Sequence, residues 1–325
     1  MKKNMLVCGA NGFIGRNALE YFRNSYDITA VLFSSKEPDY GRLDGVRYIQ
    51  ADLRLEEDVK NIFEEQHYDV VLQAAATTTG SKDVVERPYL HVTDNAVMNS
   101  WIFREATLNK VGHLLFPSCT VMYQPKDVSQ SEDDWSADDE IYHNYFGVGN
   151  MKVFSEKMCD FYSRIGETKF TAFRHSNVYG PYDKFDLDKC HVVPAFINKV
   201  TAADNEFEIW GTGKASRDVV YIDDLIEFID KCIENQESKY ELFNCGAGEA
   251  FSILELASTI MEVQGKELDV IFDTTKPDIP TTVILDCRKA ELELGWSPKV
   301  PLREGLEKTC NWYKANLLAE VDWLL

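Results

Sequence analysis

The feature that most constrains this chain is a set of three glycines that follows its first apolar segment. The stretch LVCGANGFIG carries Gly9, Gly12 and Gly15 between residues that predict a strand and residues that predict a helix. Glycines at this spacing permit a tight turn, let a backbone approach a pyrophosphate, and bring helix and strand close together. The unpaired amides at the helix N-terminus then face the phosphates. We therefore expect a dinucleotide site, against the alternative of a purely structural turn.

Buried strands alternate with helices through the first half of the chain. Strands without polar alternation, separated by helices, indicate a parallel sheet covered on both faces. The predicted fold class is therefore α/β, a doubly wound sheet of the Rossmann type. The expected strands are 4–9, 28–33, 46–51, 69–75, 113–118 and 169–176, and the expected helices are 14–24, 56–66, 94–110 and 147–165.

The remaining residues predict a smaller α/β lobe. We expect residues 1–176 to form the nucleotide-binding domain, which also receives part of 215–245, and residues 177–325 to form mainly a substrate lobe. Helices are expected here at 192–203, 221–234, 252–264 and 303–316, with a strand near 268–272.

Charge and cysteine content narrow the classes of function. The chain has 54 acidic and 34 basic residues and a net charge of −20. This balance argues against binding to nucleic acid or to an anionic membrane, because phosphate contacts need clustered Lys and Arg. It leaves room for a local basic pocket that binds an anionic small molecule. The eight cysteines form no C-x-x-C pair, so we expect reduced core thiols and no metal site.

Nothing in the sequence predicts export or a membrane span. The apolar stretch near the N-terminus runs directly into the glycines and is shorter than the core of a signal peptide. No run approaches the ~18 apolar residues that a spanning helix needs. The expected location is the cytoplasm.

The end of the second expected strand bears on the form of the coenzyme. An NAD site usually has an acidic residue there to hold the ribose hydroxyls. This chain has Ser34, Ser35 and Lys36 instead, and two hydroxyls and a cation suit a 2′-phosphate. Arg16, just after the third glycine, is a further candidate. The sequence favours NADP and leaves NAD possible, and the alternative is that these are ordinary solvated loop residues.

Several motifs resemble those of the extended short-chain dehydrogenase/reductases, the NAD-dependent epimerase/dehydratase family. They are the glycine turn, Asp52-Leu53, LQAAA (72–76), Lys152 and NVYGP (177–181), and the resemblance covers nearly the whole chain. The segment 177–224 most resembles the GDP-L-fucose synthases within that family. The resemblance implies an NAD(P)-dependent enzyme that oxidises or reduces C4 of a nucleotide sugar, with or without epimerisation. It also implies a GDP-sugar as substrate and a homodimer.

The resemblance also implies roles for individual residues. Lys152 would hold the nicotinamide ribose, His191 would be a general acid for epimerisation, and Arg217 would lie near the nucleotide phosphates. The substrate would meet Thr77, Asn177, His191 and Arg217. The coenzyme would meet Gly9, Asn11, Gly12, Phe13, Ile14, Gly15, Ser34, Ser35, Lys36, Asp52, Leu53, Ala74, Ala75, Ala76 and Lys152.

One departure affects the chemical step. The family's catalytic tyrosine lies four residues before the lysine, and Val148 occupies that position here. Cys119 occupies the position of the usual Ser or Thr, and Thr120 follows it. Tyr145, seven residues before Lys152, would lie on almost the same helix face and is the first candidate for a relocated acid/base. The alternative for Tyr145 is a packed aromatic at the helix start.

Cys119 and Thr120 are the further candidates for this acid/base role, Cys119 because the charge of Lys152 would favour a thiolate.

These residues leave two functions open. The first is an enzyme with Lys152, His191 and a relocated proton-transfer group. The second is a catalytically impaired subunit or regulator that binds nucleotide sugar and NAD(P). The retained Lys152 and His191 favour the first.

The resemblance suggests that the dimer pairs through the helices at 94–110 and 147–165. The apolar residues predicted for this seam, with a buried intrachain face as the alternative, are Met98, Trp101, Ile102, Phe154, Met158 and Phe161.

Overall fold

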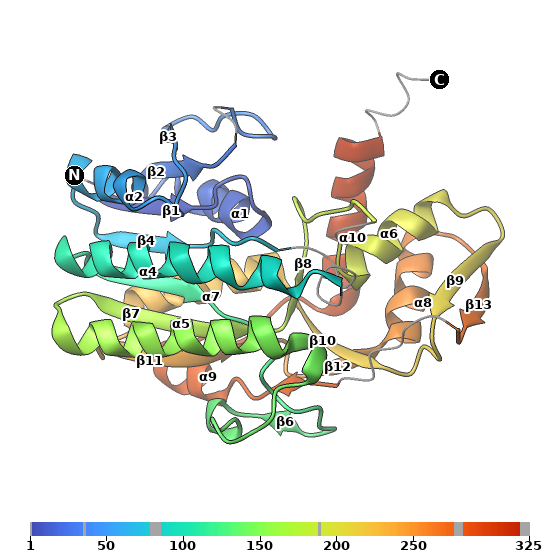
Figure 1. The fold of residues 1–325 in the computed structure, drawn as a ribbon. Helices are drawn as coiled ribbons and strands as arrows, with labels where there is room; N and C mark the ends of the chain where they lie inside the picture. The colour runs from blue at the N-terminus through green and yellow to red at the C-terminus, as the bar shows by residue number, and fades with distance from the viewer. Residues whose placement is uncertain (1, 35–36, 79–85, 188–189, 276–281, 319–325) are drawn as a thin grey trace.

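The centre of the molecule is a seven-stranded sheet in which every neighbouring pair is parallel (Figure 1). The computed structural model describes residues 2–34, 37–78, 86–187, 190–275 and 282–318. The strands of this sheet are β1 (Lys3–Cys8), β2 (Tyr26–Leu32), β3 (Val46–Gln50), β4 (Val70–Gln73), β5 (His113–Pro117), β7 (Lys169–His175) and β11 (Tyr240–Cys245). Their order is β11-β7-β5-β4-β1-β2-β3, so the order reverses between β1 and β4, where ligands of such sheets bind.

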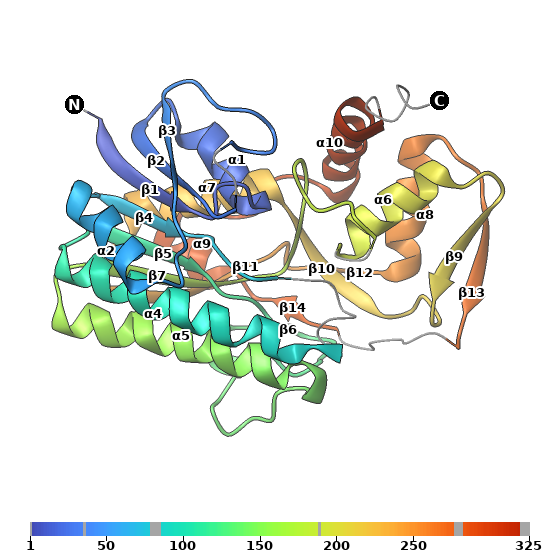
Figure 2. The same cartoon turned by 45° about the horizontal axis from the view of Figure 1, so that its top comes forward.

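Helices cover both faces of the sheet. One face carries α2 (Glu56–Glu65), α4 (Thr93–Leu108) and α5 (Phe146–Ile165), and the other carries α1 (Phe13–Phe22), α7 (Ile222–Asn235) and α9 (Arg288–Leu294). Figures 1 and 2 show α4 and α5 side by side along one face. Each face is sealed by its own apolar cluster, with Phe103 and Phe170 in one and Phe173 and Phe228 in the other. The sheet is therefore buried on both sides, as its unbroken apolar strands predict.

The remaining elements form a smaller lobe beside the carboxyl edge of the sheet, at the right of Figure 2. Its helices α6 and α8 pack on each other beside the parallel pair of β9 and β13. A three-stranded sheet, β12-β10-β8, and a short parallel pair, β6 with β14, lie beside the large sheet. These elements are β6 (Ser129–Gln130), β8 (Asn177–Tyr179), α6 (Val192–Ala202), β9 (Glu206–Trp210), β10 (Ser216–Tyr221), β12 (Ala250–Ser252), α8 (Ile253–Gln264), β13 (Asp269–Asp273), β14 (Ile284–Leu285) and α10 (Leu302–Tyr313). Short helical turns are η1 (Pro88–His91), η2 (Glu132–Asp134), η3 (His143–Tyr145) and η4 (Lys314–Leu318).

The predicted fold class is confirmed. The six expected strands correspond to β1, β2, β3, β4, β5 and β7, and the four expected helices to α1, α2, α4 and α5. β11, which completes the sheet beside β7, was not expected as a strand. All eight cysteines are free thiols. Within the described part of the chain, no helix is both long and apolar enough to cross a membrane.

Candidate active site

The glycine turn lies where the strand order reverses. Gly9 has a φ of 77°, and a Cβ at this position would lie 2.7 Å from the backbone of Ala75 after β4. A Cβ on Gly15 would overlap the carbonyl oxygen of Gly9. The turn packs directly against the end of β4, so glycine is required at both of its ends.

The N-terminus of α1 keeps its backbone amides available. Its N-cap residue is Gly12, no side chain caps it, and its first turn contains no acidic residue. Unpaired N–H groups and the positive end of the helix dipole attract a phosphate. Asn11, Phe13 and Ile14 are partly buried in the same turn. These features fit the pyrophosphate of a dinucleotide.

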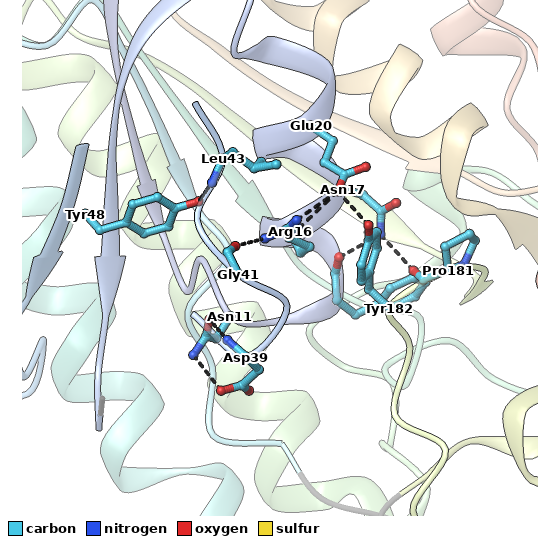
Figure 3. Close-up of polar contacts among 11 residues, drawn as sticks. Asn11, Arg16, Asn17, Glu20, Asp39, Gly41, Leu43, Tyr48, Pro181 and Tyr182 are labelled. Atoms are coloured by element: carbon cyan, nitrogen blue, oxygen red, sulfur yellow. Dashed lines mark hydrogen bonds and ion pairs between the residues drawn. The ribbon is translucent and has the colours of Figure 1, made fainter. Parts of the chain in front are cut away.

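A loop that follows β2 folds back over the start of α1 (Figure 3). The Asn11 carboxamide donates to Oδ1 of Asp39 and accepts from the Asp39 backbone N–H, both at 3.2 Å. Further along the loop, the Leu43 N–H donates to the hydroxyl of Tyr48 at 3.1 Å. The loop therefore places the carboxylate of Asp39 next to the glycine turn.

Arg16, on α1, forms a hydrogen bond with the same loop. Its guanidinium donates to the Gly41 carbonyl at 2.7 Å and pairs with Glu20 at 3.0 Å (Figure 3). The side chain is buried, and the guanidinium lies 5.2 Å from the ring centre of Tyr182. The suggestion that Arg16 helps to hold a 2′-phosphate loses its support, because its donors face the loop and Glu20.

At the end of β2, one of the residues predicted to contact the coenzyme is exposed to solvent. Ser34 is exposed, while Ser35 and Lys36 lie outside the described residues. The neighbouring Phe33 ring is exposed, and the guanidinium of Arg54 lies 4.8 Å from its centre. A hydroxyl and a cation are therefore present beside this strand end.

Asp52 and Leu53, which follow β3, have different environments. The Asp52 carboxylate accepts two hydrogen bonds from the Arg54 guanidinium, at 2.9 and 2.8 Å, and one from the Arg54 N–H at 3.0 Å, and this cation lowers the pKa of the Asp52 carboxyl. Arg54 also reaches Asp94 on α4 at 3.1 Å. Leu53 is buried in the apolar cluster beneath α2 and α4. Asp52 thus offers a polar group at the sheet edge, whereas the Leu53 side chain packs in the core.

The segment after β4 is held against α4. The Thr77 N–H donates to Oδ1 of Asn95 at 2.8 Å, and the Asn95 amide donates to the Thr77 carbonyl at 3.0 Å. Ala74 and Ala75 are partly buried, and Ala76 is exposed. Three small side chains in a row leave space next to the glycine turn.

Lys152 lies on α5 at the carboxyl end of β5. Its ammonium donates to the carbonyl of Pro117 at 2.8 Å and lies 4.8 Å from the ring centre of Phe116. Burial lowers the pKa of Lys152, while the nearby Cys119 and Glu156 act in the opposite direction. This cation therefore lies at the same sheet edge as the glycine turn, and Val148, one turn earlier, is partly buried and has no group that transfers protons.

Cys119 and Thr120 follow β5 and are both partly exposed. Burial raises the pKa of the Cys119 thiol, and the charge of Lys152 opposes this shift without reversing it. Burial thus acts against the thiolate expected beside Lys152, and the acid/base role of Cys119 stays a prediction. The Thr120 carbonyl accepts a hydrogen bond from the Tyr123 N–H at 3.0 Å.

Tyr145 is the N-cap residue of α5 rather than part of its continuous face. It packs on the apolar cluster that contains Met122 and Tyr123, and it is partly buried. Burial raises the pKa of its hydroxyl, and Arg217 opposes the shift. The relocated acid/base role of Tyr145 therefore stays a prediction, with a packed aromatic at the helix start as the alternative.

The other predicted substrate residues lie on β8, on β10 and directly before α6. The Asn177 carboxamide donates to the Asp218 carbonyl at 3.0 Å, so its amide fastens β8 to β10. Arg217 on β10 is partly buried and donates to the Ser216 carbonyl at 2.8 Å. His191 precedes α6, its side chain is exposed, and none of the described residues forms a hydrogen bond with its ring.

A buried ion pair stands behind Lys152. Glu156, one turn later on α5, pairs with Arg174 of β7 at 2.8 Å, and each side chain is only 3% exposed. The Ser118 hydroxyl donates to Glu156 at 2.5 Å, and Arg174 donates to the Tyr123 hydroxyl at 3.0 Å. This network joins the ends of β5 and β7 to the helix that carries Lys152.

One ionisable side chain at this edge was not expected from the sequence. His175 is the last residue of β7, and its Nδ1 lies 2.8 Å from the Ser176 carbonyl oxygen. The available signal was a histidine at the carboxyl end of a buried parallel strand, directly before the NVYGP segment.

Comparisons with known proteins agree with this arrangement. The model of the NAD dependent epimerase/dehydratase family matches residues 5–246. The GDP-L-colitose synthase of Yersinia pseudotuberculosis is 29% identical over 315 residues, which cover 95% of this chain and 97% of that protein. The GDP-L-fucose synthase of Sinorhizobium fredii is 30% identical over 275 residues, 82% of this chain and 86% of its own. The solved UDP-glucose 4-epimerase of Thermotoga maritima has the same fold, with a TM-score of 0.84 at 24% identity over 97% and 99% of the two chains.

Proposed function

Because the chain belongs to the NAD-dependent epimerase/dehydratase family, we propose that it is an NAD(P)-dependent enzyme that oxidises or reduces C4 of a nucleotide sugar. One observation carries the proposal. The uncapped α1 N-terminus after β1 and the ammonium of Lys152 after β5 lie at the same carboxyl edge of one parallel sheet. The first fits a pyrophosphate and the second a ribose with its nicotinamide.

The described residues fit the coenzyme along this edge. The segment after β4 carries only small side chains beside the glycine turn, which would leave room for a flat ring system. When bound, the coenzyme would accept or donate a hydride, and the protein would hold it through the α1 amides and Lys152. We further propose NADP as the preferred form, supported by the exposed hydroxyl of Ser34 at the end of β2.

We propose a GDP-sugar as substrate, on the names of the relatives together with the basic side chain of Arg217 on β10. Arg217 would meet the diphosphate, while Thr77, Asn177 and His191 would surround the sugar. Cys119, Thr120 and Tyr145 would line its reacting side. With a valine at position 148, the proton at the C4 oxygen must pass through a group other than the usual tyrosine.

We propose a homodimer built on α4 and α5. Met98 and Ile102 of the predicted seam are buried inside the subunit, so they belong to the intrachain core and not to a partner surface. Phe154 and Phe161 on α5 are 53% and 54% exposed, and Ile165 continues this row. This exposed row would form the dimer interface.

A cytoplasmic location is part of the proposal, because all eight cysteines are unpaired.

Coenzyme binding tests the proposal directly. Isothermal titration with NADP, NADPH, NAD and NADH should show binding to the wild type, tightest for the phosphorylated forms. Lys152→Met should weaken binding, because it removes the ammonium from the ribose site. Lys157→Met is the matched control, since this exposed lysine lies on the same helix and should leave affinity unchanged. A wild type that binds none of the four coenzymes refutes the proposal.

The absence of the catalytic tyrosine favours one second candidate, a subunit that binds both ligands without turnover. Incubation with NADPH and GDP-4-keto-6-deoxymannose, followed by nicotinamide absorbance and product mass, separates the two. Tight binding without any product would support the binding subunit. Val148→Tyr should then create reductase activity, because the tyrosine would return to its place one turn before Lys152.

A further inference from the structure

The segment between β8 and α6 contacts α1 through Tyr182 and the residue before it. The Tyr182 hydroxyl donates to Oε1 of Glu20 at 2.6 Å, and the guanidinium of Arg16 lies 5.2 Å from the centre of the Tyr182 ring (Figure 3). The Pro181 carbonyl accepts a hydrogen bond from the Asn17 carboxamide at 3.0 Å. This segment is therefore fastened to the helix that follows the glycine turn.

The ring of Tyr182 also meets the loop that follows β2. The rings of Tyr182 and Tyr40 pack edge to face, with 4.9 Å between their centres. Tyr40 directly follows Asp39, whose carboxylate and N–H form hydrogen bonds with Asn11 of the glycine turn. Because the adenosine ribose of a dinucleotide lies beside the end of the second strand, a coenzyme on this turn would meet the same loop.

The aromatic contacts continue into the smaller lobe. The Trp312 indole, near the end of α10, has its centre 4.9 Å from that of the Tyr182 ring and 5.7 Å from that of the Tyr40 ring. The Phe185 ring stacks on Trp312 at 6.0 Å, and the Phe185 carbonyl accepts from Asn198 on α6 at 2.9 Å. Tyr182 thus touches the coenzyme loop on one side and the smaller lobe on the other.

The backbone of Tyr182 is held in an unusual conformation. Its φ is 67°, one of two positive values among the non-glycine residues that the structure describes. A bulky residue is strained in this region, so its side-chain contacts must offset the strain. Glycine would suit the backbone better, which means that the aromatic ring is what this position adds. Loss of the contacts on either side would let the segment relax.

Resting on the function proposed above, we propose that Tyr182 is a positioning residue that couples the coenzyme loop to the nucleotide-sugar lobe. A bound coenzyme orders the loop and holds Tyr40 against Tyr182 and Trp312. These contacts in turn hold the smaller lobe in the arrangement that binds the sugar. The first ligand orders the segment, so the second loses less conformational entropy and binds more tightly. The coupling is reciprocal, because both ligands stabilise the same arrangement.

Affinities measured with and without the other ligand test the coupling. NADPH and GDP-mannose are a suitable pair, because GDP-mannose has a hydroxyl at C4 and offers NADPH no carbonyl to reduce. In titration calorimetry, saturating GDP-mannose should lower the NADPH dissociation constant of the wild type by at least ~5-fold, the lower end of typical couplings. Tyr182→Ala and Trp312→Ala should still bind NADPH, but GDP-mannose should change its dissociation constant by less than about twofold.

Two further variants separate coupling from damage to the fold. Tyr182→Phe keeps the ring and loses only the hydrogen bond to Glu20, so its coupling should stay within about twofold of the wild type. Tyr21→Ala is the matched control on α1. It removes an exposed ring whose hydroxyl bonds to Asp230, and it should leave the coupling unchanged. Loss of coupling in Tyr21→Ala would contradict the proposal, because any change to α1 would then have the same effect.

A readout with the coenzyme alone tests the first half of the coupling. In ¹⁵N-labelled protein, the indole N–H resonance that disappears in Trp312→Phe should move when NADPH is added, and Tyr40→Ala should abolish this movement. The proposal is overturned by a Trp312 resonance that ignores bound NADPH. It is equally overturned if Tyr182→Ala keeps the wild-type coupling, or if a wild type that binds both ligands shows none.

Other failures bear on the proposed function instead. A wild type that binds no coenzyme refutes that function. A wild type that binds NADPH but not GDP-mannose refutes the GDP-sugar as substrate, and the Trp312 resonance then decides the coupling by itself.

Discussion

The carboxyl ends of β1 and β2 lie at the same edge of the sheet as those of β5 and β7, but the two regions offer a ligand different chemical groups. The first region works through backbone, with left-handed Gly9 and the uncapped amides that start at Gly12. The second works through side chains, with Lys152 on a carbonyl and His175 at a strand end. Recognition of a phosphate by backbone amides depends on the fold of the turn, so it does not require particular side chains beside it. A chemical step depends on one functional group, and Val148 has no group that could transfer the proton.

The two regions also differ in what supports them. Beneath the glycine turn lie apolar residues and the Asn11–Asp39 contact, which is exposed. Beneath Lys152 lies a buried charge network. Charges held in a low-dielectric interior constrain geometry strongly and are costly to disturb. Variants in the second region should therefore have the larger effects on folding, and variants in the first should act mainly on affinity.

The largest effect is expected from Arg174→Met. It leaves the Glu156 carboxylate buried and unpaired, so the free energy of unfolding should fall by ~3–5 kcal/mol. Urea denaturation at pH 7 measures this change. The double variant Arg174→Met/Glu156→Met removes both charges and should recover most of the loss. A loss below about 1 kcal/mol in the single variant would show that this pair behaves as an ordinary surface ion pair, which contradicts its burial.

A smaller, pH-dependent effect is expected at Asp183, in the segment between β8 and α6. Asp183 is 5% exposed, its Oδ1 accepts from the Lys184 N–H at 2.7 Å, and no described residue pairs with its Oδ2. Burial raises the pKa of Asp183 to about 7. Between pH 4 and 7 the folded state therefore holds a proton that the unfolded state releases, and stability falls as the pH rises through this window.

Asp183→Asn removes that dependence. The variant should gain up to about 4 kcal/mol over the wild type at pH 8 and nothing at pH 4, since a carboxyl whose pKa is raised this far loses that amount when ionised. Thermal melts at the two pH values measure the difference. An equal shift at both pH values would mean that the carboxyl does not titrate between them.

A change of about tenfold in affinity is expected from Gly12→Ala. A Cβ there would lie 3.0 Å from the Gly9 carbonyl oxygen and would crowd the approach to the α1 amides. The coenzyme dissociation constant should rise by about tenfold, or roughly 1.4 kcal/mol, with little change in thermal stability. Asn61→Ala on α2 is exposed and serves as the control. Unchanged affinity would place the pyrophosphate away from this turn.

The smallest effect is expected from Asp39. Its carboxylate lies beside the glycine turn, where a 2′-phosphate would meet a like charge. Asp39→Asn and Asp39→Ala should both shift the affinity ratio towards NADP over NAD by about threefold, the size of a solvent-screened charge effect. Only Asp39→Ala also loses the side-chain acceptor of Asn11, so only this variant should lower the melting temperature. A shift towards NAD in either variant would contradict the electrostatic argument.

The sequence alone determined the elements that depend on local patterning. Unbroken apolar runs and helical spacing predicted β1 to β5, β7 and the four long helices, because periodicity and glycine turn chemistry act over a few residues. The same local logic identified the glycine turn and singled out Lys152 in its helix. The eight unpaired cysteines also followed from their spacing.

Tertiary structure decided what depends on distant neighbours. The sheet gained β11 from residues far along the chain, Arg16 turned to Glu20 and Gly41, and Met98 faced the core instead of a partner. Sequence spacing also did not reveal that Arg174 of β7 pairs with Glu156 on the helix that carries Lys152. Strand pairing and side-chain charge partners are non-local, and burial sets the pKa of a group such as Cys119, so only the folded chain determines them.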